Sequence, residues 1–217
     1  MKYFPFMMNL EGQAGLVLGG GRVAWHKIKV LLPFGARLMV VSEAFCADLL
    51  SLWEKDKKQL ELYKGSFTEK LLERDGKQIA FVVAATDDEA LQEEVSNCCR
   101  ARGIPVNVVD VKEKSTFFFP ALFSWEDLVV AVSTGGQVPV AAGYVKEQIR
   151  KSLPPYYGEM IRTLGAEREK VKKTGISYEE RKQFFLELLR YGEEHEGQIP
   201  QEIIQKKLEE KIRKYTH

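Results

Sequence analysis

AGLVLGGGRVA, residues 14–24, joins a short apolar run to a glycine-rich turn and the start of an amphipathic segment. Gly19, Gly21 and Ala24 match the pattern G-x-G-x-x-A between a strand and a helix, which is the context that a dinucleotide-binding turn requires. The first glycine makes the tight turn, the second leaves room for a pyrophosphate, and the small third residue lets helix and strand pack closely. A glycine-rich turn in some other strand–helix unit is the alternative interpretation.

The first turn of the expected helix is the predicted cofactor site. Free backbone N–H groups and the partial positive charge of a helix N-terminus both attract phosphate. Arg22 either touches the phosphate or is a solvated helix residue. The predicted contacts are Gly19, Gly20, Gly21, Arg22, Val23 and Ala24.

Strand and helix patterns alternate through residues 1–112. Besides 14–18, apolar runs at residues 37–41, 60–63, 79–85 and 104–109 predict strands. Residues 87–102 predict a helix with Thr86 or Asp87 as its N-cap. Because short connections join the strands and helices, we predict the α/β class, with a Rossmann-type parallel sheet.

Two further groups are candidates for contact with the cofactor. An acidic residue that binds the adenosine ribose is expected about 20 residues after the glycine turn, at the end of the second strand. Glu43 follows Ser42 at this place, although it also fits the start of the next helix. No arginine directly follows Val41 to bind a 2′-phosphate, so the pattern favours NAD over NADP. Thr86 and Asp87, after the fourth strand, are the second group.

The pattern changes after residue 112. Residues 117–122 and 128–133 predict two strands, and 139–153 a helix. Beyond them only charged helical stretches remain, at 156–173, 178–192 and 199–215. We therefore predict an NAD-binding domain at 1–112, a small strand-rich dimerisation and substrate region at 113–153, and a helical C-terminal region at 154–217. Two strands are too few to bury their own apolar faces, which predicts a symmetric homodimer.

The composition limits the classes of function. Hydrophobic residues make up 45% and charged residues 29% of the chain, as in globular proteins. A net charge of +1 argues against broad capture of nucleic acid or of a membrane surface. Cys46, Cys98 and Cys99 have the spacing of neither a disulfide framework nor a zinc site, so no metal site is predicted. No apolar run reaches the roughly 18 residues of a membrane span, and residues 1–13 lack the apolar core of a signal peptide, so we expect a cytoplasmic protein.

Five segments together resemble one family. In chain order they are YFPFMMNLEGQAGLVLGGGRVAWHK from Tyr3, FVVAATDDEALQEEV from Phe81, RGIPVNVVD from Arg102, FFFPALF from Phe117 and LVVAVSTGGQVPVAAGYVKEQI from Leu128. Their order and spacing are similar to those of the precorrin-2 dehydrogenases, which also form the N-terminal module of siroheme synthase. The resemblance covers residues 3–154.

The resemblance implies an oxidoreductase that uses NAD to oxidise precorrin-2 to sirohydrochlorin on the route to siroheme. It also implies a homodimer built largely from the middle region. Some members of the family insert ferrous iron as well, and the sequence does not choose between the two kinds. The family's functional aspartate falls on Asp110, at the end of NVVD, and its serine–threonine segment falls on Ser133 and Thr134. With Gly135 and Lys146, these two hydroxyl residues are the predicted substrate-binding group.

Asp110 is the predicted catalytic residue. It lies just past the end of a strand, where ligands bind in open α/β sheets. A carboxylate there accepts the proton released on oxidation, or faces the nitrogens of the macrocycle. An exposed turn aspartate is the alternative.

The chain departs from the family pattern at two places. His26-Lys27 stands where the family usually has Arg-Lys, and Gly143 stands where it usually has an arginine. If that arginine binds a substrate carboxylate elsewhere, this chain must use another cation. The cations considered are Lys112, Lys114, Lys146 and Arg150, each of which also fits a solvated surface charge.

Two other classes of function compete with the dehydrogenase. A dinucleotide-binding regulatory module binds NAD without turnover, but it gives no reason for NVVD and STGG. A chelatase or tetrapyrrole carrier without the redox step is consistent with the missing arginine at Gly143. Formation of NADH from precorrin-2 and NAD⁺ discriminates among the three.

Overall fold

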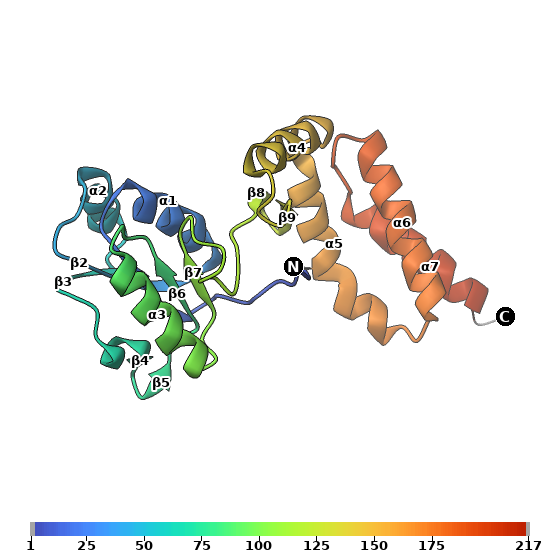
Figure 1. Ribbon diagram of the computed structural model, residues 1–217. Helices are drawn as coiled ribbons and strands as arrows, with labels where there is room; N and C mark the ends of the chain where they lie inside the picture. The colour runs from blue at the N-terminus through green and yellow to red at the C-terminus, as the bar shows by residue number, and fades with distance from the viewer. Residues whose placement is uncertain (1–2, 216–217) are drawn as a thin grey trace. The chain divides into compact units, whose positions relative to one another are not determined.

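The chain divides into two compact units, Met1–Phe119 and Pro120–His217 (Figure 1). The computed structural model describes residues 3–215. Most of the predicted middle part and the whole predicted helical part belong to the second unit. Their separate roles in dimerisation and substrate binding stay a prediction.

The first unit contains a five-stranded sheet in the order β3-β2-β1-β6-β7. All its pairings are parallel, which confirms the predicted α/β, Rossmann-type class. The strand order changes direction at β1, so the crevice between the carboxyl ends of β1 and β6 is the place where ligands bind in such sheets. The strands are β1 (Ala14–Leu18), β2 (Arg37–Ser42), β3 (Leu60–Lys64), β6 (Phe81–Ala84) and β7 (Val106–Val108).

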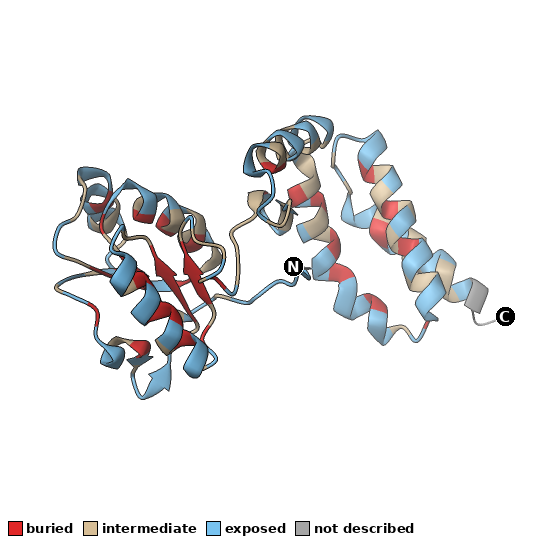
Figure 2. Ribbon diagram, in the orientation of Figure 1, coloured by how far each residue is buried: buried red, intermediate tan, exposed pale blue. Residues whose placement is uncertain are grey.

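Helices cover both faces of this sheet, because successive strand residues point to opposite sides. Leu16 and Val82 pack with Val95 of α3 (Glu89–Ala101). Val17 and Val83 pack instead in the cluster formed with α1 (Arg22–Leu31) and α2 (Ala47–Lys55). Strands β6 and β7 are buried over their whole length, as Figure 2 shows in red, and β1 is buried from Gly15 onward. A short hairpin of β4 (Glu73–Arg74) and β5 (Lys77–Gln78) and two 3₁₀ turns, Leu32–Phe34 and Glu69–Leu72, complete the unit.

The second unit joins one hairpin to four helices. Strands β8 (Ala121–Trp125) and β9 (Leu128–Val132) pair antiparallel. The helices are α4 (Pro139–Ser152), α5 (Tyr156–Lys173), α6 (Tyr178–Glu194) and α7 (Gln201–Tyr215). Met160, Leu164, Phe184 and Leu188 form most of the core between α5 and α6. Within the described residues, no helix is long and apolar enough to cross a membrane.

Two predicted boundaries were wrong. The strand predicted at 117–122 begins only at Ala121, because Pro120 has no N–H for a ladder and residues 115–117 bond to β7 instead. The N-cap of α3 is Asp88 and neither Thr86 nor Asp87. Its carboxylate accepts hydrogen bonds from the amides of Ala90 and Leu91 at 3.0 and 3.1 Å. Thr86 lies outside the helix because the Gln92 side-chain amide holds its carbonyl at 2.6 Å.

Candidate active site

The glycines of the β1–α1 turn have different structural roles. Gly19 has a φ of +110°, and a Cβ there would overlap the carbonyl oxygen of Ala85 after β6. A Cβ on Gly20 would overlap the carbonyl oxygen of Ala44 after β2. The chain's own backbone therefore requires both glycines, because strands and turn approach too closely for a side chain.

Gly21 differs from its two neighbours, since nothing in the described chain requires it to be glycine. Its φ of −83° suits any residue, and a Cβ there would meet no atom within 4 Å. Gly21 is the N-cap of α1, where no side chain caps the helix and no acidic residue stands in the first turn. The first amides of α1 therefore face open space that an anion can enter.

The carboxyl ends of three strands meet at this turn. The amide of Gly19 donates to the carbonyl of Val41 at 2.9 Å, and the amide of Ala85 donates to the carbonyl of Leu18 at 2.7 Å. The structure thus brings the glycine turn beside the ends of β2 and β6, which carry the other predicted cofactor contacts. These contacts are Glu43, Thr86 and Asp87.

Among the predicted cofactor contacts, Ala24 is fully buried in the core, whereas the polar side chains lie at the surface or close to it. Glu43 is exposed, and its carboxylate accepts a hydrogen bond from the Ser66 hydroxyl at 3.2 Å. Arg22 is also exposed and lies 4.0 Å from the Asp48 carboxylate, a solvated pair of little energetic weight. The hydroxyl of Thr86 accepts from the amide of Asp88 at 3.3 Å. Their contacts with a cofactor stay a prediction.

Asp110 occupies an unusual backbone conformation just after β7. Its φ is +61°, in the left-handed region, and its side chain is exposed. The amide of Val111 donates to the carbonyl of Val108 at 3.2 Å and closes the turn around it. Aspartate adopts this region more readily than most L-residues, and residues held in it concentrate at functional sites.

Side chains on both sides of the turn hold Asp110 in place. The buried Ser115 hydroxyl accepts from the amide of Val108 at 2.9 Å. Its single O–H hydrogen is shared between the carbonyls of Val108 and Val111, whose oxygens lie 3.0 and 2.9 Å from Oγ. The side-chain amide of Asn107 donates to the carbonyl of Phe117 at 3.0 Å. These contacts were not predicted, because they join residues on two sides of a turn whose shape the sequence pattern does not specify.

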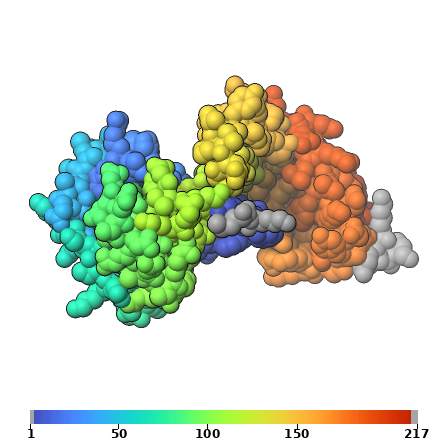
Figure 3. Space-filling model, in the orientation of Figure 1, coloured from blue at the N-terminus to red at the C-terminus, as the bar shows by residue number. Residues whose placement is uncertain are grey.

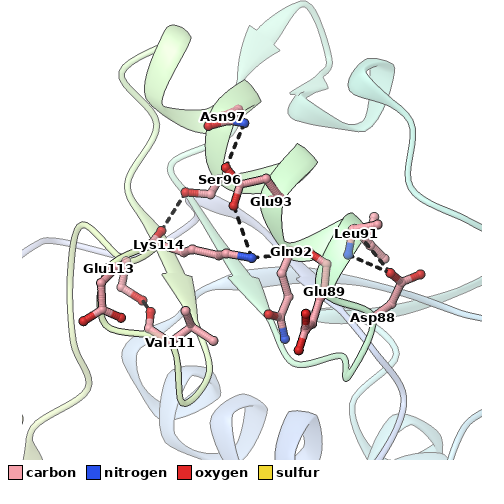
Figure 4. Close-up of polar contacts among 12 residues, drawn as sticks. Asp88, Glu89, Leu91, Gln92, Glu93, Ser96, Asn97, Val111, Glu113 and Lys114 are labelled. Atoms are coloured by element: carbon pink, nitrogen blue, oxygen red, sulfur yellow. Dashed lines mark hydrogen bonds and ion pairs between the residues drawn. The ribbon is translucent and has the colours of Figure 1, made fainter.

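Helix α3 also holds the loop that follows β7, through contacts with Lys114 (Figure 4). The Ser96 hydroxyl donates to the carbonyl of Lys114 at 2.8 Å. The Lys114 ammonium lies 3.2 Å from the Glu93 carboxylate and 3.3 Å from the carbonyl of Glu89, and it lowers the pKa of Glu93. Lys114, considered above as a cation for the substrate, is therefore engaged in holding the loop.

Lys27 of α1 packs against an aromatic ring and interacts electrostatically with Asp110. Its Nζ is 4.4 Å from the centroid of the Phe119 ring. Burial lowers the pKa of Lys27, and the Asp110 carboxylate acts in the opposite direction. In the sequence, His26-Lys27 stands out only as a departure from the family pattern, and no role was predicted for Lys27. Its burial depends on Phe119, far along the chain, so local pattern gives no signal for it.

The predicted substrate-binding residues lie in the second unit. The Ser133 hydroxyl accepts from the amide of Gly135 at 3.1 Å, and the Thr134 hydroxyl accepts from the amide of Val138 at 3.2 Å. The two hydroxyls thus shape the turn that leads into α4. Lys146, on α4, pairs with the neighbouring Glu147 at 2.8 Å. Contact of these residues with a substrate stays a prediction.

The cysteines and acidic groups show no arrangement for a bound metal. Among residues 3–215, no group of three or more His, Cys, Asp or Glu side chains is placed to hold one. Cys99 is buried, which raises the pKa of its thiol to about 12. Cys46 and Cys98 are half-buried free thiols.

The parallel sheet and its glycine turn define a dinucleotide-binding α/β protein. The model of the family described as "Putative NAD(P)-binding" matches residues 6–121. Because this match takes in more than half of the 217 residues, the chain belongs to that NAD(P)-binding family.

Named relatives extend the similarity over almost the whole chain. A siroheme synthase of Pseudomonas paraeruginosa is 36% identical over 209 residues, which are 94% of this chain and 41% of that protein. A siroheme synthase of Thioalkalivibrio sulfidiphilus is 39% identical over 189 residues, which are 87% of this chain and 37% of that protein. The chain thus spans less than half the length of these relatives. The solved structure of SirC, precorrin-2 dehydrogenase, aligns with a TM-score of 0.77 at 25% identity, covering 98% of this chain and all of that one.

The residues present are compatible with a nicotinamide dinucleotide. The open space at Gly21 and the uncapped amides of α1 form a cradle that a side chain would fill. The family match and the SirC likeness point to the same class of cofactor, and they do not distinguish NAD from NADP.

Proposed function

We propose that this chain is a precorrin-2 dehydrogenase, which oxidises precorrin-2 to sirohydrochlorin with NAD⁺ in siroheme biosynthesis. The observation that carries the proposal is the pairing of an anion cradle at Gly21 with a constrained carboxylate, Asp110, in one small unit. The likeness to SirC over all of that chain supports the same reaction. The free cysteines of this chain suit the cytoplasm, where we expect the protein to act.

The residues of the first unit divide the work of binding and proton transfer. The amides at the start of α1 bind the pyrophosphate, and the Glu43 carboxylate accepts hydrogen bonds from the ribose hydroxyls. The bound dinucleotide supplies the acceptor for the hydride that leaves precorrin-2. The Asp110 carboxylate accepts the proton that leaves with it, so the oxidation is balanced.

The second unit supplies the predicted contacts with the substrate. Precorrin-2 is a tetrapyrrole whose rim carries carboxylates, which need cations and N–H or O–H donors. Ser133 and Thr134 are assigned to these carboxylates on the family resemblance, and their O–H groups are the donors that such anions bind. Gly135, as part of the same turn, and Lys146, as a nearby cation, complete the predicted group. Ferrous iron, if this chain inserts it, is a second substrate.

The activity is tested by mixing the protein anaerobically with precorrin-2 and NAD⁺ and following the absorbance of NADH. We expect NADH to form only when all three are present. If NAD⁺ binds but no NADH appears, the chain is a regulatory module. If sirohydrochlorin binds and takes up iron without NADH formation in any reaction, the chain is a chelatase. Either result would contradict the proposal.

We expect NAD⁺ to bind more tightly than NADP⁺, by about tenfold or more, because an exposed carboxylate at Glu43 repels a 2′-phosphate. Calorimetric titration of both dinucleotides measures the ratio. Glu43→Gln should reduce this ratio of affinities, because it removes the negative charge and keeps the shape of the side chain. Tighter binding of NADP⁺ to the wild-type protein would contradict the assignment of Glu43.

We expect the protein to form a homodimer through its second unit. The β8–β9 sheet has only two strands, and Leu128, Val129 and Val130 of β9 stay half-buried within this chain. On α4, whose surface Figure 3 shows in yellow, Val140 is 80% exposed and Tyr144 66% exposed. Light scattering should report twice the mass of one chain. Val140→Glu should shift the measured mass toward that of a single chain. A monomer at micromolar concentration would contradict this.

A further inference from the structure

Lys27 holds a half-buried ammonium group that lacks an acidic partner at close range. Within residues 3–215, no carboxylate lies within 4.0 Å of its Nζ. The group rests instead on the Phe119 ring at 4.4 Å. A cation on an aromatic face recovers only part of the hydration that burial removes.

Three other half-buried lysines are paired. The side chains of Lys114, Lys146 and Lys211 are 23%, 24% and 18% exposed. Their ammonium groups lie 3.2, 2.8 and 2.6 Å from carboxylates of Glu93, Glu147 and Glu187. This comparison makes Lys27 the exception, because it has the desolvation of such a site without the direct ion pair.

The position of Lys27 links the two features of the candidate site. It lies on α1, the helix whose N-terminus forms the anion cradle at Gly21. Its charge also interacts with the carboxylate of Asp110. An anion that binds Lys27 therefore enters the same electrostatic environment as the group proposed to accept the proton.

We propose that Lys27 binds a carboxylate of the tetrapyrrole substrate and thereby holds the macrocycle beside Asp110. The inference rests on the proposed function. A carboxylate on the rim of the substrate supplies the direct partner that Lys27 lacks, and a hydrogen bond between charged groups is the stronger for being partly desolvated.

The direction of the pKa shift is consistent with this role. Burial alone lowers the pKa of Lys27, since it disfavours the charged form. An arriving carboxylate favours the charged form and so reverses the shift. In the free protein, the charged form of Lys27 is therefore destabilised by burial. A bound substrate carboxylate compensates for this destabilisation.

The test compares Lys27→Met with Lys29→Met. Lys29 is a matched control, because it lies on the same helix with its Nζ 4.6 Å from the Trp25 ring but is exposed. The probe is uroporphyrin, a stable porphyrin with carboxylates on every pyrrole ring, titrated by its absorbance in the presence of NAD⁺. We expect Lys27→Met to weaken binding of the probe roughly 10- to 100-fold, as for the loss of a hydrogen bond between charged groups.

Further measurements separate a binding role from a structural one. Lys27→Met should keep the melting temperature and the affinity for NAD⁺, Lys27→Arg should bind the probe nearly as the wild type does, and Lys29→Met should be unchanged. Wild-type affinity for the probe in Lys27→Met would overturn the inference. The inference would also be overturned if both Lys27 variants bound neither the probe nor NAD⁺ and melted at a lower temperature than the wild type.

The failure of the proposed function gives a different result. If wild-type protein binds the probe but forms no NADH from precorrin-2, the dehydrogenase assignment fails, and the titration still decides the role of Lys27. If wild-type protein does not bind the probe at all, the inference about Lys27 is overturned as well.

Discussion

Gly21→Asp is expected to abolish dinucleotide binding while the fold becomes slightly more stable. The backbone at Gly21 suits any residue, and its Cβ would meet no atom within 4 Å. Asp is a better N-cap than glycine, by a few tenths of a kcal/mol, so α1 gains. The same carboxylate occupies the cradle and repels the pyrophosphate, which should weaken NAD⁺ binding by about 100-fold or more. Calorimetric titration and thermal denaturation measure the two effects.

Gly20→Ala is the matched control for Gly21→Asp. Its Cβ would overlap the carbonyl oxygen of Ala44, so we expect it to lower the melting temperature. The opposite signs of the two stability changes distinguish a ligand site from a packing constraint. A fall in melting temperature for Gly21→Asp, similar to that for Gly20→Ala, would show that the glycine serves the fold and would contradict the cradle.

Asp110→Ala is expected to lower turnover by about 100-fold or more, the scale of a positioned acid–base group, with little change in NAD⁺ affinity. Asp110→Asn keeps the shape and tolerates a positive φ but does not accept the proton. If the Asn variant is as inactive as the Ala variant, charge or proton transfer is what the reaction needs. If it keeps most of the activity, Asp110 only positions the substrate and water takes the proton.

Asp75→Ala separates backbone strain from chemistry in this experiment. Asp75 also has a positive φ, +54°, and stands at the β4–β5 turn, where no candidate residue lies. Alanine in the left-handed region costs about 1 kcal/mol, so both variants should lose similar stability. Only Asp110→Ala should lose turnover. If Asp75→Ala loses as much activity, or if Asp110→Ala turns over normally, Asp110 is not the catalytic residue.

The sequence predicted the sheet well because its signals are local. The apolar run 14–18 ends at Gly19, so β1 was predicted at its observed bounds, and α5 likewise at 156–173. Local pattern also placed Asp110 just beyond a strand. It did not predict the conformation of Asp110, which depends on the hydroxyl of Ser115 reaching back to Val108.

The errors have the same origin in contacts between distant residues. FFFPALF has the composition of a strand, yet its first residues have their hydrogen bonds satisfied by β7, and Pro120 delays the ladder. In the sequence Lys27 has the pattern of an ordinary exposed helix lysine, and only the structure shows its contact with Phe119. In both cases the deciding partner lies far along the chain, where periodicity carries no information.

The hydrogen bonds beside β7 also bear on how this protein avoids aggregation. Val106 and Val108 turn their peptide groups away from β6, on the outer edge of the sheet. Thr116 takes up both groups of Val106, at 2.7 Å through its amide and 2.8 Å through its hydroxyl, and Ser115 takes up both groups of Val108. An open edge of this kind is a template for a strand of another molecule. Here two hydroxyl side chains take the place of a sixth strand, so another chain cannot extend the sheet at β7 by edge-to-edge pairing.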